Sequence, residues 1–243
     1  MNNIWFVLII LVFFSISRSQ NQFESDTIKT DKGNLVITFI GHGTLMMTFN
    51  NMVIHVDPVG RYADYTKLPK ADIILLTHHH GDHMDVDAIN KISKGNTDLI
   101  LTETCAKEIK SGIVMKNGDV KVVKGIKVTA VPAYNIVHKR DNGEPYHPKG
   151  VGNGYVIKLG DKRVYIAGDT ENIPEMKQLA PIDIAFLPMN LPYTMTPEMV
   201  ADAVKMIHPK ILYPYHFGNT NTDELIALLK GKSDCEIRIR KMN

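Results

Sequence analysis

Cysteine is scarce in this chain, and neither sign of charge is in marked excess. Only Cys105 and Cys235 occur among 243 residues, and one pair so far apart is not a disulfide framework. An exported protein could still bond them, although we expect two buried free thiols. Lysine and arginine number 28 against 26 aspartates and glutamates, and the basic residues are scattered along the chain. Because the basic stripe of a nucleic-acid-binding protein is missing, we expect a small-molecule substrate and no nucleic-acid partner.

The chain also has no apolar run long enough to cross a bilayer. The segment 4–14 is apolar throughout but has only eleven residues, against about 20 for a membrane-spanning helix. This length suits the apolar part of a signal peptide, and Ser15, Ser17 and Ser19 could supply the small residues of a cleavage site. We therefore expect residues 1–19 to be a signal peptide that is removed on export, leaving a periplasmic or extracellular protein. Since no lysine or arginine precedes the apolar part, an uncleaved membrane anchor is the alternative.

Beyond this leader, the composition is that of one globular domain. The chain is 44% apolar and 22% charged, which is enough for one sizeable core, and no repeat or linker divides it. Residues 20–34 are polar and are predicted to form a flexible lead-in. The domain is therefore expected to span residues 35–243.

Short β-rich runs and helical patterns alternate along this domain. Strands are predicted at residues 35–40, 45–49, 52–56, 73–76, 99–102, 120–123, 126–131, 155–159, 163–167, 184–188, 211–214 and 235–239. Helices are predicted from residue 86 towards 95 and at 105–109, 197–207 and 222–229. The segment 133–153 is too long for a simple connection and is expected to be a lid that faces the substrate. The pattern on its own indicates a mixed α/β fold.

Histidines are concentrated in residues 77–83, whose sequence is T-H-H-H-G-D-H. The apolar run Ile73–Leu76 before them is predicted to be a buried strand, so the histidines lie where a core strand ends. In an extended chain, alternate side chains point to the same side. His78 and His80 can therefore bind one metal ion together.

A glycine then turns the chain, so that Asp82 and His83 can face a second metal ion close to the first. Two metals about 3.5–4 Å apart form the arrangement that stabilises a hydrolytic transition state. Clustered histidines can also be a solvated turn or an adventitious metal-binding tract. The strand in front, the fixed offset of the acid and further candidates downstream argue against that explanation. These candidates lie in the long loop or at the ends of later predicted strands: His147, Asp169 and His216.

The pattern H-x-H-x-D-H resembles the metal motif of the metallo-β-lactamase superfamily, and the likeness extends from about Leu35 to the C-terminus. The stretches G-H-G-T, V-D-P, Y-H-P-K-G, A-G-D-T and P-Y-H-F-G are most similar to its metal-dependent hydrolase branch, which includes ascorbate-phosphate lactonase-like proteins. The resemblance implies an α/β fold arranged as a four-layer αββα sandwich of two mixed sheets flanked by helices. It also implies that metal one takes His78, His80 and His147, metal two takes Asp82, His83 and His216, and Asp169 bridges them.

Other polar residues are expected beside these ligands. His138 lies in the same loop as His147 and is the alternative third ligand of metal one, although the Pro-Lys-Gly after His147 favours His147. His42 in G-H-G-T and Asp57 in V-D-P fit positions behind the ligands, where they would orient them. Asp82 is the expected catalytic residue, because it would lie close to the attacking water and could take its proton.

Lys149 and Tyr193, on adjoining loops, are candidates for contacts with the substrate or its leaving group. His79 lies between two predicted ligands and should point away from them, and His55 is expected to be a structural histidine on a strand face.

These residues predict a hydrolase whose cofactors are two divalent metal ions, Zn²⁺ in the first instance and Mn²⁺ as the alternative. The two cations would generate a hydroxide near neutral pH, which would cleave an ester-like bond such as a lactone or a phosphodiester. A di-iron oxidoreductase of the same fold is a competing hypothesis, but that branch prefers a carboxylate where His80 stands. A non-catalytic metal-binding protein of the cell envelope is another.

Overall fold

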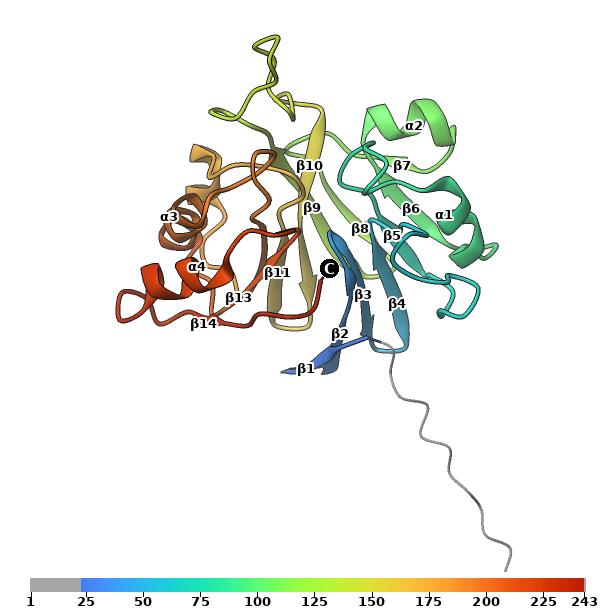
Figure 1. Ribbon diagram of the computed structural model, residues 1–243. Helices are drawn as coiled ribbons and strands as arrows, with labels where there is room; N and C mark the ends of the chain where they lie inside the picture. Colours follow the sequence, from blue (N-terminus) through green and yellow to red (C-terminus); the bar gives the residue numbers. More distant parts are fainter. Residues whose placement is uncertain (1–22, 243) are drawn as a thin grey trace, which may run out of the picture.

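The computed structural model describes residues 23–242, which form two β-sheets stacked face to face with helices on both outer surfaces (Figure 1). The predicted four-layer αββα sandwich is therefore confirmed. The expected signal peptide, residues 1–19, lies outside the described residues, so its cleavage and the export of the protein stay predictions. Within residues 23–242, no helix combines the length and the apolar character that a membrane crossing requires.

The first sheet has seven strands in sequence order, antiparallel up to β4 and parallel from there on. Its strands are β1 (Ser25–Thr30), β2 (Gly33–Gly41), β3 (Thr44–Phe49), β4 (Met52–Val56), β5 (Ile73–Leu75), β6 (Asp98–Leu101) and β7 (Ile113–Val114). Helices α1 (Val86–Ile92) and α2 (Glu103–Ile109) cover its outer face (Figure 1).

The second sheet also has seven strands, and each again pairs with its neighbours in the sequence. Its strands are β8 (Val120–Val123), β9 (Ile126–Ala133), β10 (Gly152–Leu159), β11 (Lys162–Ile166), β12 (Ile184–Pro188), β13 (Ile211–Tyr215) and β14 (Glu236–Ile237). The 3-10 helix η1 (Pro174–Gln178) and the helices α3 (Pro197–Ile207) and α4 (Thr222–Leu229) lie on its outer side (Figure 1). Strands β11, β12 and β13 run parallel to one another.

Strand β5 is buried on both faces. Ile73 and Leu75 belong to the core between the two sheets, whereas Ile74 and Leu76 pack on the side that carries α1 and α2. Because successive side chains of a strand point to opposite faces, a strand covered on both sides shows an unbroken apolar run. The chain leaves the sheet directly after this run, so the histidines that follow lie at the edge of the sandwich.

Residues 23–34, the described part of the polar segment 20–34, are not the flexible lead-in that the composition predicted. Residues Ser25–Thr30 form β1, which pairs antiparallel with β2 along its whole length. The Asp26 carboxylate accepts hydrogen bonds from Tyr213, Arg238 and Arg240, so the far end of the chain fixes this edge strand. The domain therefore begins at least ten residues earlier than predicted, because an edge strand needs little apolar surface.

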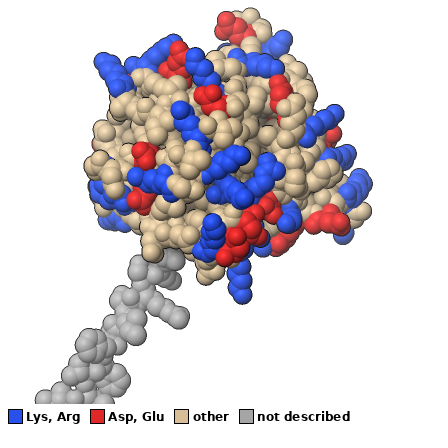
Figure 2. All heavy atoms as spheres, turned by 180° about the vertical axis from the view of Figure 1, so that it is seen from behind, with Lys and Arg blue, Asp and Glu red and all other residues tan. Residues whose placement is uncertain are grey.

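The surface carries both signs of charge, and no disulfide joins the two cysteines. Lysine and arginine are interspersed with aspartate and glutamate on the face seen from behind (Figure 2). Cys105 is a buried free thiol, as predicted, and Cys235 is free but only half-buried.

Candidate metal centre

The segment after β5 brings four metal-binding side chains to one edge of the sandwich. His78 and His83 are buried, while His80 and Asp82 are half-exposed. The backbone N–H groups of His83 and Met84 both donate to the carbonyl of His80 at 2.9 Å, which turns the chain between the two pairs. The turn brings His83 within 3.3 Å of Asp169 and Asp82 within 3.6 Å of His216.

The second sheet contributes three more side chains: His147, Asp169 and His216. Asp169 lies between the two histidines and the first group. Asp169 follows β11, His216 follows β13, and His147 comes from the connection between β9 and β10. The Asp169 carboxylate lies 3.2 Å from His147 Nε2, 3.4 Å from His216 Nε2 and 3.3 Å from His83 Nε2. The buried Asp169 thus connects the two halves of the site.

The donor atoms fall into two main groups that a carboxylate joins. Within each group, all donor atoms lie within 4.8 Å of one another. The first group is His78, His80 and His147, and the second is His42, Asp82, His83 and His216. A third group, His78, His83 and Asp169, shares residues with both. The first two coincide with the sets that the sequence assigned to two metals, except that His42 joins the second. The third group spans both, as a bridging carboxylate would require.

Three of the imidazoles are held through Nδ1, which leaves Nε2 facing the site. The Nδ1 partners are Thr77 Oγ1 at 3.0 Å for His78, Asp57 Oδ2 at 2.8 Å for His83 and Asn135 Oδ1 at 2.7 Å for His147. An imidazole that donates its proton from Nδ1 presents an unprotonated Nε2, and this is the form that binds metals.

Several buried atoms at this point have no hydrogen-bond partner among the described residues. They are Nε2 of His78, His83 and His216 and Oδ1 of Asp169. Buried polar atoms are nearly always paired, so a group of unpaired ones that face one another needs an explanation. Divalent cations explain it, because each of these atoms carries a lone pair that a metal would accept.

The electrostatics of the site also favour a positive charge at its centre. Burial lowers the pKa of His83, but the carboxylates of Asp169 and Asp57 outweigh burial and raise it well above its ordinary value. Burial raises the pKa of Asp169, but His216, His83 and His147 hold it well below its ordinary value. Burial and the neighbouring His147 lower the pKa of His80 to about 4, so that imidazole is neutral near pH 7. The carboxylates of Asp169 and Asp57 thus stabilise either a proton on His83 or a metal ion beside it, and the two would compete.

Asp82 is the carboxylate of the centre that reaches solvent. Its side chain is 37% exposed, and its Oδ2 lies 3.1 Å from His42 Nε2 and 3.6 Å from His216 Nε2. Burial raises the pKa of Asp82, but the neighbouring imidazoles of His216 and His42 lower it well below its ordinary value. The group is therefore ionised at neutral pH.

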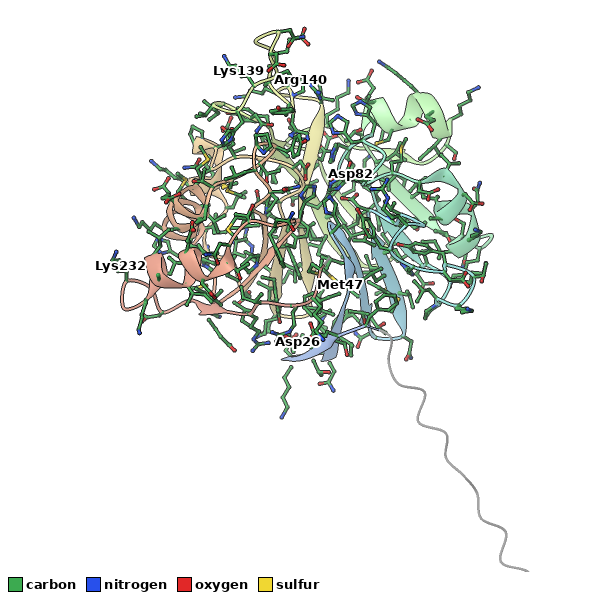
Figure 3. The ribbon with its side chains drawn as sticks, viewed as in Figure 1. Asp26, Met47, Asp82, Lys139, Arg140 and Lys232 are labelled. Atoms are coloured by element: carbon green, nitrogen blue, oxygen red, sulfur yellow. The ribbon has the colours of Figure 1, made fainter. Side chains whose placement is uncertain are left out.

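A pocket of about 340 Å³ opens over the exposed side of the centre. His80, Asp82, His216 and Tyr193 are among the residues that line it. Figure 3 shows Asp82 below the loop that carries Lys139 and Arg140.

Lys149 is not among the residues that line this pocket, and its predicted contact with the substrate stays a prediction. Its ammonium lies 2.7 Å from Glu175 Oε1 and over the ring of Tyr134. His138 also points elsewhere, because its Nδ1 lies 2.8 Å from Glu171 Oε1, and His147 is the loop histidine at the centre.

Two other histidines belong to none of the donor groups. His79 is exposed, and its ring lies 5.0 Å from that of His80. His55 is buried on its strand, where Nε2 donates to the carbonyl of Pro69 at 3.0 Å.

Several residues near the centre were missed by the sequence analysis, among them Asn190, which lines the pocket. Arg140 and Tyr146 line the pocket from the long loop, and Asn135 and Glu171 support that loop from beneath. For Asn135, Arg140 and Tyr146 the available signal was their location in the long loop 133–153. For Glu171 it was the position two residues after the predicted bridging aspartate. Nothing local in the sequence shows that Asn135 and Glu171 meet.

A family model described as the beta-lactamase superfamily domain matches residues 36–216, a range that contains the seven side chains predicted as metal ligands. The chain is 30% identical over 192 residues to a metal-dependent hydrolase of Pelotomaculum thermopropionicum, and this alignment covers 74% of this chain and 83% of that one.

Solved structures agree with this likeness. A crystal structure from Parabacteroides distasonis, described as that of a metal-dependent hydrolase, is 52% identical, covers 91% of this chain and 100% of its own, and gives a TM-score of 0.87. Igni18, a metallo hydrolase from Ignicoccus hospitalis, has the same fold at 22% identity and a TM-score of 0.72, with coverage of 86% and 96%.

Proposed function

The chain belongs to the metallo-β-lactamase superfamily and is a metal-dependent hydrolase, and from this premise we propose that it uses two zinc ions to cleave an ester-like bond in a lactone or a phosphodiester. The observation that carries the proposal is the pair of donor groups that meet at Asp169. A single structural metal would not need a second group of donors that opens into a pocket.

The proposed ligands follow the geometry of the two groups. His78, His80 and His147 hold the first metal, Asp82, His83 and His216 hold the second, and Asp169 bridges them. His42 stays a partner of Asp82, because the 3.1 Å contact between His42 Nε2 and Asp82 Oδ2 satisfies that nitrogen. Asp57 orients His83 and also accepts hydrogen bonds from Thr77 at 2.8 Å and 2.6 Å.

Two bound cations lower the pKa of water and polarise a carbonyl or phosphoryl oxygen, which is the chemistry that ester hydrolysis requires. The chain's own residues supply the other functions. Asp82 is ionised, faces the pocket and takes the proton of the attacking water. Tyr146 and Tyr193 form part of the wall against which the substrate lies, with their rings 5.0 Å apart and nearly perpendicular.

The test combines metal analysis with a panel of substrates. The purified protein should hold two metal ions per chain and hydrolyse a lactone or a phosphodiester in preference to a phosphomonoester or a β-lactam. Removal of the metals with a chelator should abolish this activity, and zinc should restore it.

Substitution of the bridging residue sharpens the test. Asp169→Asn should lower both the metal content and the rate by at least about a hundredfold, because the amide carries no charge to offset two cations. His79→Ala is the matched control, since His79 is exposed and lies between two proposed ligands in the sequence. Full activity of Asp169→Asn, or a wild-type protein that binds two metals and turns over no substrate of the panel, would contradict the proposal.

A further inference from the structure

A buried carboxylate lies beside the metal centre but belongs to none of its donor groups. Glu171 is two residues after Asp169, and its side chain is only 1% exposed. Burying an ionised carboxylate is costly unless hydrogen bonds compensate it. The donors that compensate Glu171 therefore indicate what the residue does.

These donors belong to the start of the connection 134–151. Glu171 Oε2 accepts the backbone N–H groups of Ile136 and Val137, and Oε1 accepts that of His138, each at 2.7 Å. Oε1 also accepts Asn135 Nδ2 at 3.1 Å. Burial raises the pKa of Glu171, but these hydrogen bonds outweigh it and keep the pKa below the ordinary value. One carboxylate thus fixes four consecutive residues of the loop.

Asn135 extends this network to the metal centre. Its Nδ2 donates to Glu171 and to the carbonyl of Tyr193 at 2.9 Å. Its Oδ1 accepts both the backbone N–H of His147 at 2.9 Å and the Nδ1–H of the same residue at 2.7 Å. Because the two donor contacts determine which side of the amide is oxygen, that oxygen can only face His147.

We propose that Glu171 and Asn135 are positioning residues: Glu171 anchors the start of the loop and, through the Asn135 amide, sets the orientation and the protonated nitrogen of the His147 ring. The inference rests on the proposed function in one respect, that His147 is a metal ligand. The inference gives the loop a role beyond covering the pocket. If residues 135–138 lose their order, the His147 ring loses its orientation, and the geometry of the first metal changes with it.

The experiment uses three substitutions in the full chain and one control. Asn135→Ala removes the acceptor of His147, Asn135→Asp keeps an acceptor there, and Glu171→Gln replaces one acceptor oxygen of the anchor with a donor. Glu175→Gln is the matched control, since Glu175 also holds this loop, through Tyr134 and Lys149, but has no contact with the His147 network.

Two readouts separate the anchor from the metal. Amide hydrogen exchange at Ile136, Val137 and His138 should be about 10- to 100-fold faster in Glu171→Gln, because charge-assisted hydrogen bonds are lost. Visible absorption of the Co²⁺-substituted protein should change in Asn135→Ala, with Co²⁺ affinity about 10- to 100-fold weaker. Asn135→Asp keeps the acceptor of His147 but sets a carboxylate oxygen against Glu171 and the Tyr193 carbonyl, so it should restore the Co²⁺ affinity only in part. Glu175→Gln should leave the exchange rates, the Co²⁺ spectrum and the Co²⁺ affinity as in the wild type.

The outcomes distinguish this inference from the proposed function. If Asn135→Ala keeps the wild-type Co²⁺ spectrum and affinity, the orienting role is refuted, whatever the activity. If Glu171→Gln leaves exchange at residues 136–138 unchanged, the anchoring role is refuted. A wild-type chain that binds no Co²⁺ would overturn the proposed function and the orienting role together, and the exchange measurement would still decide whether Glu171 anchors the loop.

Discussion

Replacing Arg140 with methionine should weaken the use of anionic substrates far more than the use of neutral ones. Among the described residues that line the 340 Å³ pocket, Arg140 alone is a lysine or arginine. No carboxylate of residues 23–242 lies within ion-pair distance of it, so its charge is free to meet a ligand. The guanidinium lies 5.1 Å from the centre of the Tyr146 ring, and Nη2 donates to the Tyr146 carbonyl at 3.4 Å. These contacts hold the cation beside the pocket wall.

The expected size of the effect follows from the exposure of this charge. A charge-assisted hydrogen bond contributes about 1.5–3 kcal/mol when shielded, whereas an exposed ion pair contributes about 0–1 kcal/mol. Arg140 is exposed but borders a pocket that a substrate would close, so about 1–2 kcal/mol is reasonable. At about 1.4 kcal/mol per factor of ten, Arg140→Met should raise KM for an anionic substrate roughly 5- to 30-fold. The stem of methionine keeps the apolar contact with Tyr146.

The assay compares two 4-nitrophenyl esters, one with a remote negative charge and one without. Mono-4-nitrophenyl succinate carries a carboxylate beyond the scissile ester, and 4-nitrophenyl acetate carries none. The ratio of their kcat/KM values should fall in Arg140→Met, while kcat/KM for the acetate should change little. Raising the ionic strength should reduce the ratio in the wild type as well, because salt screens exposed charges.

Lys139→Met is the control, since Lys139 has the same charge at the neighbouring position and does not line the pocket. An equal fall of the ratio in both variants would show that only the general field of the loop matters. An unchanged ratio in Arg140→Met would refute the reasoning altogether.

Two further predictions concern the support of the centre and the edge of the first sheet. A Cβ at Gly43 would lie 2.7 Å from His83 Cε1, so Gly43→Ala should displace that ring and weaken metal binding about tenfold or more in a metal titration, whereas Gly95→Ala, which meets nothing within 4 Å, should not. Burial raises the pKa of Asp26, but Tyr213, Arg240 and Arg238 lower this pKa below its ordinary value of 3.8. The ionised Asp26 therefore stabilises the fold above about pH 4, and this stabilisation is lost as the pH falls through the pKa of the folded state. Asp26→Asn should therefore cost about 1–2 kcal/mol at pH 7, seen as a lower Tm, and the difference from the wild type should close in acid; a constant difference would contradict it.

Elements with strong local signals were predicted closely. The helix at 197–207 matches α3 because Thr196 caps it and Pro197 occupies its first position, and the helix at 222–229 matches α4 because Asn221 caps it. The buried strand before the histidines was evident because its apolar run has no alternation. In each case the residues that determine the element lie within it or next to it.

Features that depend on distant contacts were missed. Strand β10 begins at Gly152 rather than at the predicted Tyr155, because its glycines let β10 pack against neighbouring backbone: a Cβ at Gly154 would lie 2.8 Å from the carbonyl oxygen of Ala167. Strand β1 is polar and is held by residues near the other end of the chain. The hydrogen bond between Asn135 and Glu171 joins positions 36 apart, and neither position has a local pattern that predicts the other.

The convergence of the predicted ligands follows from the direction of the strands. Strands β4, β5 and β6 run parallel in the first sheet, and β11, β12 and β13 run parallel in the second. Ligands in such sheets gather beyond the carboxyl ends of the strands, and the ends of β5, β11 and β13 are where His78, Asp169 and His216 lie.

The same register explains how the loop histidine reaches this edge. Strand β10 is antiparallel to β11, with Tyr155 opposite Ile166, so β10 starts where β11 ends. The connection 134–151 that carries His147 must therefore arrive at the carboxyl end of β11. The two sheets are joined at this point, because the backbone N–H of Asn153 donates to the carbonyl of Thr77 at 2.9 Å. The centre thus depends on the topology of both sheets, and a change that separates β10 from residue 77 should disperse the donor groups even if every donor residue is kept.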